Sequence, residues 1–504
     1  MPRRFLALLA SLALAVPAFA FAQGGTFVVG LIRDVESTDP TVGGTIDAVN
    51  YNMAIADHLV YMGPDGLEPW VIESWDATPD GVYTWNIRQG ITFHDGTVLD
   101  AHAVVFNIER LVVPENDLRY GSYFQRMQSI EAVDDSTVVI DMGAFDLEFM
   151  ERMINVGIVS PTAVEEFGAG FRDAPVGSGP FTFVSYTPGE RIVLERNPNY
   201  WREGEPFVDE LIFRIIPEAG VRLIELEAGT VHYAVNMDSA DLAQAERAGL
   251  TIETGPALGR LILYMNTQRI TDADVRRAVN HAIDRQVLVD VVTNGLAEVA
   301  YYAVPRGTWA YNPDIPTYAY DVEGANQLLD EAGWVRGSDG VRAKDGERLV
   351  WEMPADSIPS RLRAAEIVAA MLLDIGVQVN IRSMDSSAYT ATARGGDHHL
   401  AWFQWAGSTA DPWVAAGDLH CNYAWNIAQY CNPELDELVD EARVSLDQER
   451  RQELYDQFFT HVQEQAYYVA VGHLPAVFVA RPEVEGVRIV GGRLLFNEAR
   501  IVAE

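Results

Sequence analysis

Residues 361–381, RLRAAEIVAAMLLDIGVQVNI, combine an amphipathic helix with the strand that follows it. Apolar residues recur at helical spacing from Arg361 to Leu373, and Gly376 is suited to end the helix. From Val377 to Ile381 apolar and polar side chains then alternate, as they do in a half-buried strand. A helix that leads into a strand within so few residues is typical of layered α/β folds. This stretch therefore predicts α/β architecture.

The rest of the chain repeats this mixture. Asp100 is placed to cap a helix from Ala101 to Val112, and Asp272 to cap one from Ala273 to Thr293 that Gly295 ends. Strands are predicted at Thr26–Leu31, Tyr83–Arg88 and Thr137–Met142, and a hairpin at Phe181–Tyr186 and Arg191–Arg196. No low-complexity tract or fixed-period repeat marks the domain boundaries.

The first residues predict export. Arg3 and Arg4 precede an apolar run over 5–16, and Ala20 and Ala22 provide small-residue cleavage sites. We expect a signal peptide over 1–22, with cleavage after Ala22 or Ala20, and favour general secretion over the twin-arginine route. No later apolar stretch approaches the roughly 20 residues of a membrane-spanning helix. The mature chain is therefore expected to be soluble, and it has no cysteine at the cleavage site for a lipid anchor.

The composition narrows the classes of partner. The 504 residues are 48% hydrophobic, which is enough for large cores, and carry a formal net charge of −37. So acidic a protein repels phosphate backbones and anionic membrane surfaces, so nucleic acid is not expected as a partner. The acidity fits either solubility in a salty exterior or a preference for cationic ligands.

Cys421 and Cys431 are the only two cysteines. In an exported chain they are expected to form a disulfide, which would stabilise its short loop by about 2–3 kcal/mol on the chain-entropy model. The alternative is a metal site that includes His420, but no second histidine or further cysteine stands at ligand spacing.

No catalytic set is recognisable. The chain has no H-E-x-x-H, G-x-S-x-G or phosphate-binding Gly-Lys motif. Residues 177–180 (GSGP) lack the last glycine of a nucleophile elbow, and residues 94–96 (HDG) suit a tight turn, so both are interpreted as turns. His398 and His399 are adjacent, and neighbours on a strand point to opposite faces, which disfavours a shared metal ion. Neither an enzyme nor a cofactor is predicted.

Aromatic residues are densest between 402 and 430. Such a cluster can be core, but the interleaved glycine, serine and acidic residues favour a binding cleft for apolar, sugar or cationic groups. The cluster consists of Trp402, Trp405, Trp413, Tyr423, Trp425 and Tyr430.

Several longer motifs resemble family 5 of the extracellular solute-binding proteins, the dipeptide, oligopeptide and nickel-binding group of bacterial ABC transporters. The resemblance rests on LEPWVIESW (67–75), YTWNIRQGITFHDGT (83–97), VVF (104–106), PVGSGPF (175–181), LERNPNYW (194–201), MNT (265–267) with VRRA (275–278), and NPELD (432–436). It extends over essentially the whole mature chain.

The resemblance implies a type II-like periplasmic binding protein with two lobes, three domains and a two-stranded hinge. By analogy domain I comprises 23–50, 177–262 and 480–504, domain II 51–176 and domain III 263–479. The implied protein is a periplasmic monomer that captures peptides or peptide-like nutrients. It would deliver them to an ABC permease that works with a cytoplasmic ATPase.

Ligand identity is where the chain departs from the peptide binders it resembles. Those proteins carry an aspartate for the peptide ammonium shortly after a Gly-Trp segment, and here Ser408 occupies that place. The arginine of the dipeptide type is likewise replaced by Ala355 and Asp356. A hydroxyl cannot act as a counter-ion in place of a carboxylate. The pattern fits longer or modified peptides held by main-chain contacts, with saccharide or opine-like solutes as the alternative.

The candidate ligand contacts come from three parts of the chain. Asp411 precedes Pro412 and could instead be structural, and Arg361 could simply be solvated. Rival functions are a secreted hydrolase, a binding protein that serves a chemoreceptor or acts as a chaperone, and a nickel binder. The candidate residues are Thr45, Ile46, Asp356, Arg361, Trp405, Gly407, Ser408, Asp411 and Trp425.

Overall fold

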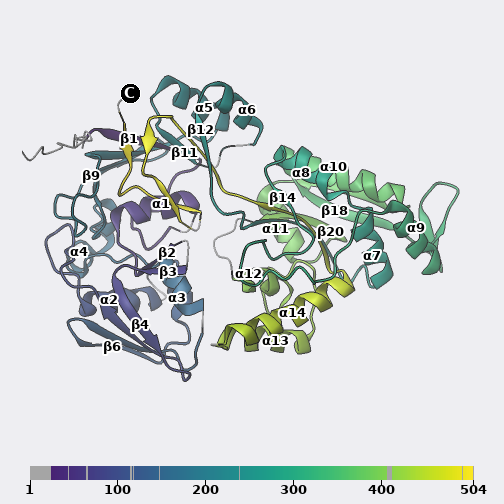
Figure 1. Ribbon diagram of the computed structural model, residues 1–504, viewed down its shortest axis with the longest axis horizontal. Coiled ribbons are helices and arrows are strands. Elements are labelled where there is room, and N and C mark those ends of the chain that lie inside the picture. Colours follow the sequence, from purple (N-terminus) through teal and green to yellow (C-terminus); the bar gives the residue numbers. More distant parts are fainter. Residues whose placement is uncertain are drawn as a thin grey trace, which may run out of the picture.

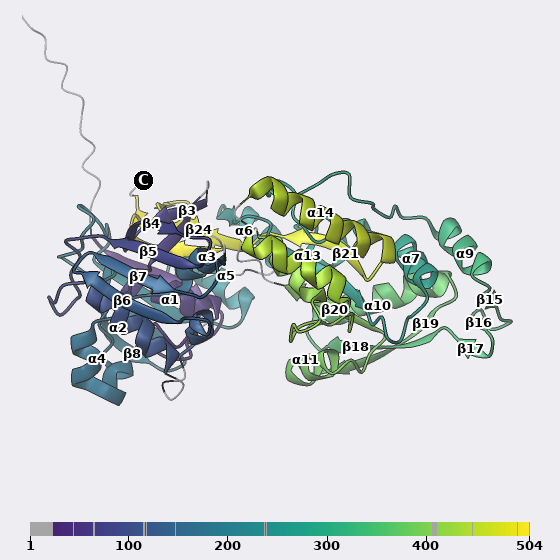
Figure 2. The same ribbon diagram turned by 90° about the horizontal axis from the view of Figure 1, so that it is seen from below.

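The computed structural model describes residues 24–502 except 44, 64–65, 114–115, 117, 147, 236, 238, 406–410, 446 and 491. Figure 1 shows two lobes side by side, and Figure 2 shows the same division from below. The predicted α/β class is confirmed, since helices cover sheets in both lobes. The predicted signal peptide lies outside the described residues. Among the described residues, no helix is both long and apolar enough to cross a membrane.

A seven-stranded sheet organises the upper part of the first lobe. Its order is β12-β22-β11-β1-β10-β9-β8, with β1 parallel to β10 and β11 and the other neighbours antiparallel. Phe27 and Val29 on β1 point to the face covered by α1, whereas Val28 points to the face covered by α5 and α6. This alternation buries both faces. The bounds are β1 Thr26–Leu31, β8 Phe181–Thr187, β9 Arg191–Arg196, β10 Glu210–Ile215, β11 Tyr233–Val235, β12 Thr251–Thr254, β22 Val477–Ala480, α1 Ile46–Ile55, α5 Ala219–Ala228 and α6 Ser239–Arg247.

The lower part of the first lobe has its own core around a four-stranded sheet, β4-β5-β7-β6. Asp100 accepts a hydrogen bond from the Ala103 amide and so caps α2, as predicted. Trp85 from β5 and Phe149 from α3 stack in this core at 5.9 Å between ring centres. The bounds are β2 Val60–Gly63, β3 Gly66–Pro69, β4 Ile72–Ala77, β5 Val82–Ile87, β6 Ser129–Asp134, β7 Thr137–Asp141, α2 Ala101–Val112, α3 Glu148–Arg152 and α4 Pro161–Phe167.

The second lobe is built on the sheet β14-β21-β13-β20, with the parallel pair β18-β19 next to it. Leu261 and Leu263 on β13 face the core beneath α7, α8 and α10. Ile262 and Tyr264 face the core beneath α13 and α14. The bounds are β13 Gly259–Met265, β14 Glu298–Val299, β18 Val350–Asp356, β19 Gln378–Met384, β20 Leu400–Trp405, β21 Tyr468–Leu474, α7 Ala273–Ala282, α8 Arg285–Thr293, α9 Val322–Glu331, α10 Pro359–Asp374, α11 Ser386–Arg394, α12 Trp413–Ala416, α13 Pro433–Val444 and α14 Gln448–Gln465. Short strands complete the two lobes: β15 Val335–Arg336, β16 Arg342–Lys344, β17 Glu347–Arg348, β23 Val484–Glu485, β24 Arg488–Val490, β25 Arg493–Leu495 and β26 Arg500–Ile501.

Two chain segments join the lobes. The chain leaves the first sheet at the end of β12, and after 255–258 it enters the second sheet as β13. It returns from β21 through 475–476 into β22. These paired crossings form the expected two-stranded hinge. They lie a few residues from 262 and 479, and the three domain limits themselves stay predictions.

One predicted helix is wrong in its extent. Apolar periodicity continues from Ala273 to Thr293, but the structure has two helices, α7 and α8. Ile283 is extended, at φ −90° and ψ 112°, and the Asp284 side chain accepts from the Val287 amide as a new cap. A capping aspartate interrupts the backbone without interrupting the apolar pattern.

Candidate functional site

The second lobe presents an aromatic wall at the end of β20. Phe403 and Trp405 are two residues apart on this strand and therefore share a face, where their rings stack at 5.0 Å and 16°. Trp425 meets Trp405 edge-on at 5.5 Å and 83°. The Trp405 indole N–H donates to the hydroxyl of buried Tyr264 at 2.9 Å. Both tryptophans are half-buried, so part of each ring surface remains accessible.

A buried ion pair lies next to this wall. The Arg260 guanidinium pairs with Asp418 at 2.8 Å and lies 6.0 Å from the centre of the Trp405 ring. The Tyr264 hydroxyl donates to the same carboxylate. Burial raises the pKa of Asp418, while Arg260 opposes this. The pair fixes the orientation of Tyr264, and through it that of Trp405.

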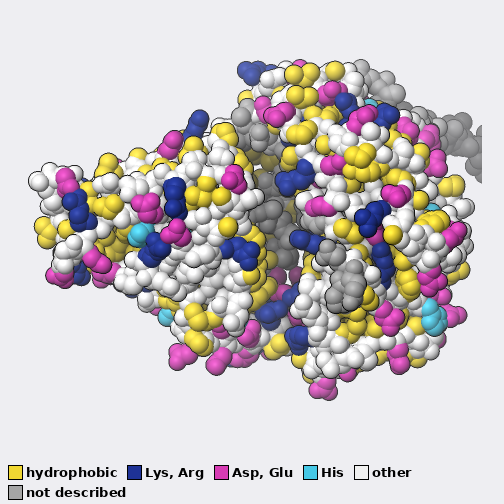
Figure 3. All heavy atoms as spheres, turned by 180° about the vertical axis from the view of Figure 1, so that it is seen from behind, with side chains coloured by type: hydrophobic (Ala, Val, Ile, Leu, Met, Phe, Trp, Pro, Cys, Tyr) yellow, Lys and Arg dark blue, Asp and Glu magenta, His cyan; other side chains and the backbone are white. Residues whose placement is uncertain are grey.

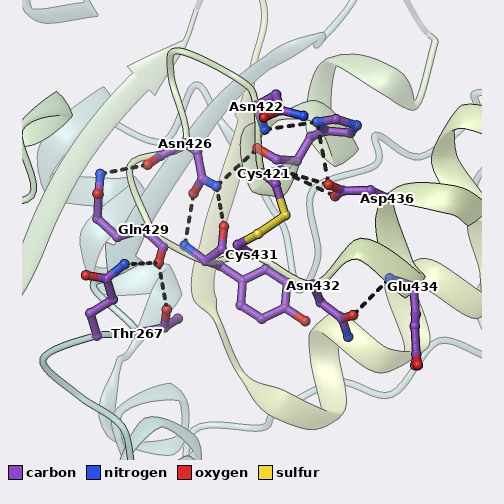
Figure 4. Close-up of a disulfide and its surroundings, with 12 residues drawn as sticks. Thr267, Cys421, Asn422, Asn426, Gln429, Cys431, Asn432, Glu434 and Asp436 are labelled. Atoms are coloured by element: carbon purple, nitrogen blue, oxygen red, sulfur yellow. Dashed lines mark hydrogen bonds and ion pairs between the residues drawn. A yellow bond between two sulfur atoms is a disulfide. The ribbon is translucent and has the colours of Figure 1, made fainter.

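The predicted disulfide is confirmed. Cys421 and Cys431 are joined at 2.09 Å, with their Cα atoms 4.5 Å apart. Figure 4 shows Asn426 inside the closed loop, where its side-chain amide donates to the carbonyl of His420 at 3.1 Å. The Cys421 amide donates to the Asp436 carboxylate at 3.1 Å, which ties the loop to α13. The loop carries Trp425, and the Arg394 guanidinium lies 4.9 Å from the centre of that ring.

Gly407 and Ser408, the expected substitutes for a peptide anchor, lie outside the described residues. Asp411 follows them and is buried, with its carboxylate 2.6 Å from Arg451. The same carboxylate accepts from the Trp413 amide at 2.8 Å, at the start of α12. These contacts hold Asp411 within its own lobe. They favour the structural alternative for Asp411 over a direct contact with ligand, which stays an untested prediction.

Asp356 and Arg361 contact each other. Their ion pair spans 2.6 Å, and the Asp356 carboxylate also accepts from the Ser386 hydroxyl at 2.9 Å. The pair connects the end of β18 to α10 and α11. Both residues stay candidate ligand contacts, with Arg361 the more exposed of the two.

Thr45 and Ile46 belong to the first lobe. The Thr45 hydroxyl accepts from the Ala48 amide at 3.4 Å as the cap of α1, and it donates to Glu36 at 3.2 Å. Its polar atoms are thus engaged in capping. Ile46 is half-buried at the first position of α1. Their ligand contacts stay predictions, so of the described candidates the structure brings together Trp405 with Trp425, and Asp356 with Arg361.

Sequence reasoning missed a set of charged residues where the lobes meet. Asp146 and Glu148 at the start of α3 lie opposite Arg443 on α13, with nitrogen–oxygen distances of 3.9 Å to each carboxylate. The Arg443 guanidinium covers the Trp413 ring at 4.1 Å. Figure 3 shows the hollow between the lobes from behind, with dark blue basic side chains along its borders. Nothing in the sequence links these residues, because they lie far apart in the chain.

Residues 94–96 form the predicted turn, in which the Gly96 amide donates to the Phe93 carbonyl at 2.9 Å, and 177–179 pack closely against the end of α1. A Cβ on Gly177 would lie 2.0 Å from the Ile55 carbonyl oxygen, so the backbone approach requires glycine. His94 Nε2 lies 3.0 Å from the Gly179 carbonyl oxygen, and burial lowers the pKa of His94 to about 4. The His398 ring is hydrogen-bonded to the Ile427 carbonyl at 3.0 Å. In the part of the chain that the structure describes, no three His, Cys, Asp or Glu residues gather as a metal site.

Comparisons with known proteins agree on one family. Residues 66–423 match the family described as "Bacterial extracellular solute-binding proteins, family 5 Middle". The probable di/tripeptide-binding protein 5 of Pseudomonas aeruginosa is 31% identical over 489 residues, covering 88% of this chain and 90% of the relative. The heme-binding protein A of Haemophilus influenzae is 29% identical over 483 residues, covering 88% and 86%.

Solved structures give the same result. NikA from Brucella suis, in complex with Fe(III)-EDTA, superposes with a TM-score of 0.85 at 26% identity, covering 95% of this chain and 100% of that one. DppA from Helicobacter pylori, in complex with the peptide STSA, has a TM-score of 0.78 at 25% identity, covering 96% and 99%.

Proposed function

Because the chain belongs to the bacterial extracellular solute-binding proteins of family 5, we propose that it captures peptides between its lobes and passes them to an ABC permease. The observation that carries this is the pair of lobes, between which the chain crosses at 255–258 and 475–476, with an aromatic wall at one edge. The similarity to proteins named for di- and tripeptides, and to a structure with bound STSA, supports peptides as the ligand class.

Binding follows from hinge mechanics. A ligand that touches both lobes stabilises the closed form by its differential contacts, and without such contacts it shifts nothing. Apolar side chains of a bound peptide can pack against the rings of Trp405 and Trp425. The extended backbone of a peptide would supply main-chain hydrogen bonds that do not depend on its sequence.

The proposal includes further elements. The chain is exported to the periplasm with a signal peptide over 1–22, and it works as a monomer with a permease coupled to a cytoplasmic ATPase. The ligand is released unchanged, so the protein is not an enzyme. Gly407 and Ser408 contact the ligand from the second lobe, and Thr45 and Ile46 contact it from the first.

The test begins with native mass spectrometry of the protein purified from its own host, followed by calorimetry with tri- and tetrapeptides. We expect a peptide mass in the complex and intact peptide after release. Trp405→Ala should weaken peptide binding at least about tenfold, as expected for an aromatic anchor. The matched control is Tyr320→Ala, an exposed aromatic of the same lobe, which should leave affinity unchanged.

Two results would contradict the proposal. One is turnover of the bound peptide. The other is a saccharide or opine-like mass in the native complex with no affinity for any peptide, because the aromatic wall could also stack on a sugar ring.

A further inference from the structure

Helix α13 divides its residues between a buried and an interlobe face. Leu435, Val439 and Ala442 are spaced to enter the core of the second lobe. Asp440 and Arg443, three residues apart, share a neighbouring face. Figure 1 and Figure 2 both show α13 reaching toward the first lobe. Arg443 therefore lies where the two lobes meet, on a helix whose apolar side packs in the core of the second lobe.

The first lobe presents two carboxylates at this boundary. Asp146 and Glu148 have side chains that are 10% and 9% exposed. Within the lobe both pair with a single guanidinium, that of Arg152, at 3.3 and 2.7 Å. Because the two carboxyl groups share one arginine within the lobe, a second guanidinium from outside the lobe can also pair with them.

Arg443 forms long ion pairs with these carboxylates but does not hydrogen-bond to them. Its Nη2 lies 3.9 Å from Asp146 Oδ2, and its Nε lies 3.9 Å from Glu148 Oε1. Both Nε and Oε1 are buried without a hydrogen-bond partner. A hydrogen bond needs about 2.7–3.2 Å, so a movement of roughly 1 Å between the lobes would complete it. Leaving both atoms unpaired and buried costs free energy that further closure recovers.

We propose that Arg443 is a closing contact of the transport cycle, whose guanidinium pairs with Asp146 and Glu148 of the opposite lobe when the lobes shut. This rests on the proposed function, since it assigns a regulator of the same cleft. The closed form then receives stabilisation that does not come from the ligand. A ligand without charged groups that bind strongly then needs to contribute less of the free energy that closes the lobes.

The Glu148 carboxyl is buried at this boundary. Burial raises the pKa of Glu148 to about 7, and Asp411 of the second lobe and Asp146 act in the same direction. Arg152 and Arg443 oppose the rise. Groups from both lobes therefore already act on one carboxyl.

The test is small-angle X-ray scattering of the full chain without ligand, fitted as a mixture of open and closed lobes. Arg443→Met keeps an apolar side chain on Trp413 and removes the charge. We expect its closed-to-open ratio to fall about three- to tenfold. Arg450→Met is the matched control, because Arg450 pairs with Glu441 and Glu453 inside the second lobe. Its ratio should equal that of the unaltered protein.

A second variant approaches the contact from the other side. Asp146→Asn with Glu148→Gln should lower the ratio similarly, and adding Arg443→Met should then have little further effect, as expected for groups that act together. The proposal is overturned if Arg443→Met matches Arg450→Met, if the effects simply add, or if the unliganded protein has no closed population. Because no ligand is added, these results do not depend on whether peptides bind.

Discussion

Asp411→Asn separates a structural role of Asp411 from a ligand-binding one. The carboxylate and its partner Arg451 have side chains that are 3% and 7% exposed, at 2.6 Å. Arg451 also donates to the Ala442 carbonyl and covers Trp309 at 4.5 Å, so it cannot easily turn to solvent. Asparagine can keep the bond from the Trp413 amide but presents an N–H₂ group toward the guanidinium.

The expected loss of stability follows from the burial of this ion pair. Removing one charge of a buried pair leaves the other uncompensated, which costs about 3–5 kcal/mol. For a domain of this size that corresponds to a fall in melting temperature of about 6–20 °C. Calorimetry and urea unfolding measure the loss. Asp339→Asn is the control, since Asp339 and Arg348 form an exposed pair and the change should stay within about 1 kcal/mol.

Peptide affinity completes the experiment. We expect Asp411→Asn to bind peptide as the unaltered protein does, at a temperature where both are folded. A stability loss below about 1 kcal/mol together with loss of peptide binding would refute the structural assignment. Asp411 would then be the ligand's anchor.

Two further outcomes are expected. Replacing Cys421 and Cys431 with serine should lower the free energy of unfolding by about 2–3 kcal/mol in urea melts, whereas a loss under about 1 kcal/mol would mean that the hydrogen bonds of Asn426 suffice to hold the loop. Burial lowers the pKa of His398 to about 4, so the unfolded chain takes up a proton at a higher pH than the folded one as the pH falls from about 6.5. The free energy of unfolding of the unaltered protein, compared with that of His398→Asn, should therefore fall by up to about 3 kcal/mol toward pH 4. A difference between the two proteins that does not change with pH would contradict this.

Local features could be predicted because their causes are local. The strand Thr26–Leu31 and the helix Ala101–Val112 were predicted with the bounds that the structure has. Each follows from a periodic apolar pattern and, for the helix, from the cap at Asp100. The disulfide followed from having only one possible pairing. The break between α7 and α8 was missed because a capping aspartate and a solvated one look alike in a sequence.

The candidate site could be predicted only in part. The aromatic density pointed to Trp405 and Trp425, which the structure places in contact. It could not reveal that Asp356 pairs with Arg361, or that Asp411 pairs with Arg451. Whether a charged side chain is free or already neutralised depends on a neighbour that another element supplies.

Hydrophobic periodicity and caps act within a few residues, so the α/β class, the family resemblance, the single disulfide and several individual helices and strands could be predicted from the chain alone. Where the chain crosses between the lobes, and which charges meet there, could be learned only from the folded molecule. Arg443 opposes Asp146 and Glu148 because two distant crossings set the relative position of α13 and α3. Such contacts depend on how whole lobes pack, and no local pattern in the chain records them.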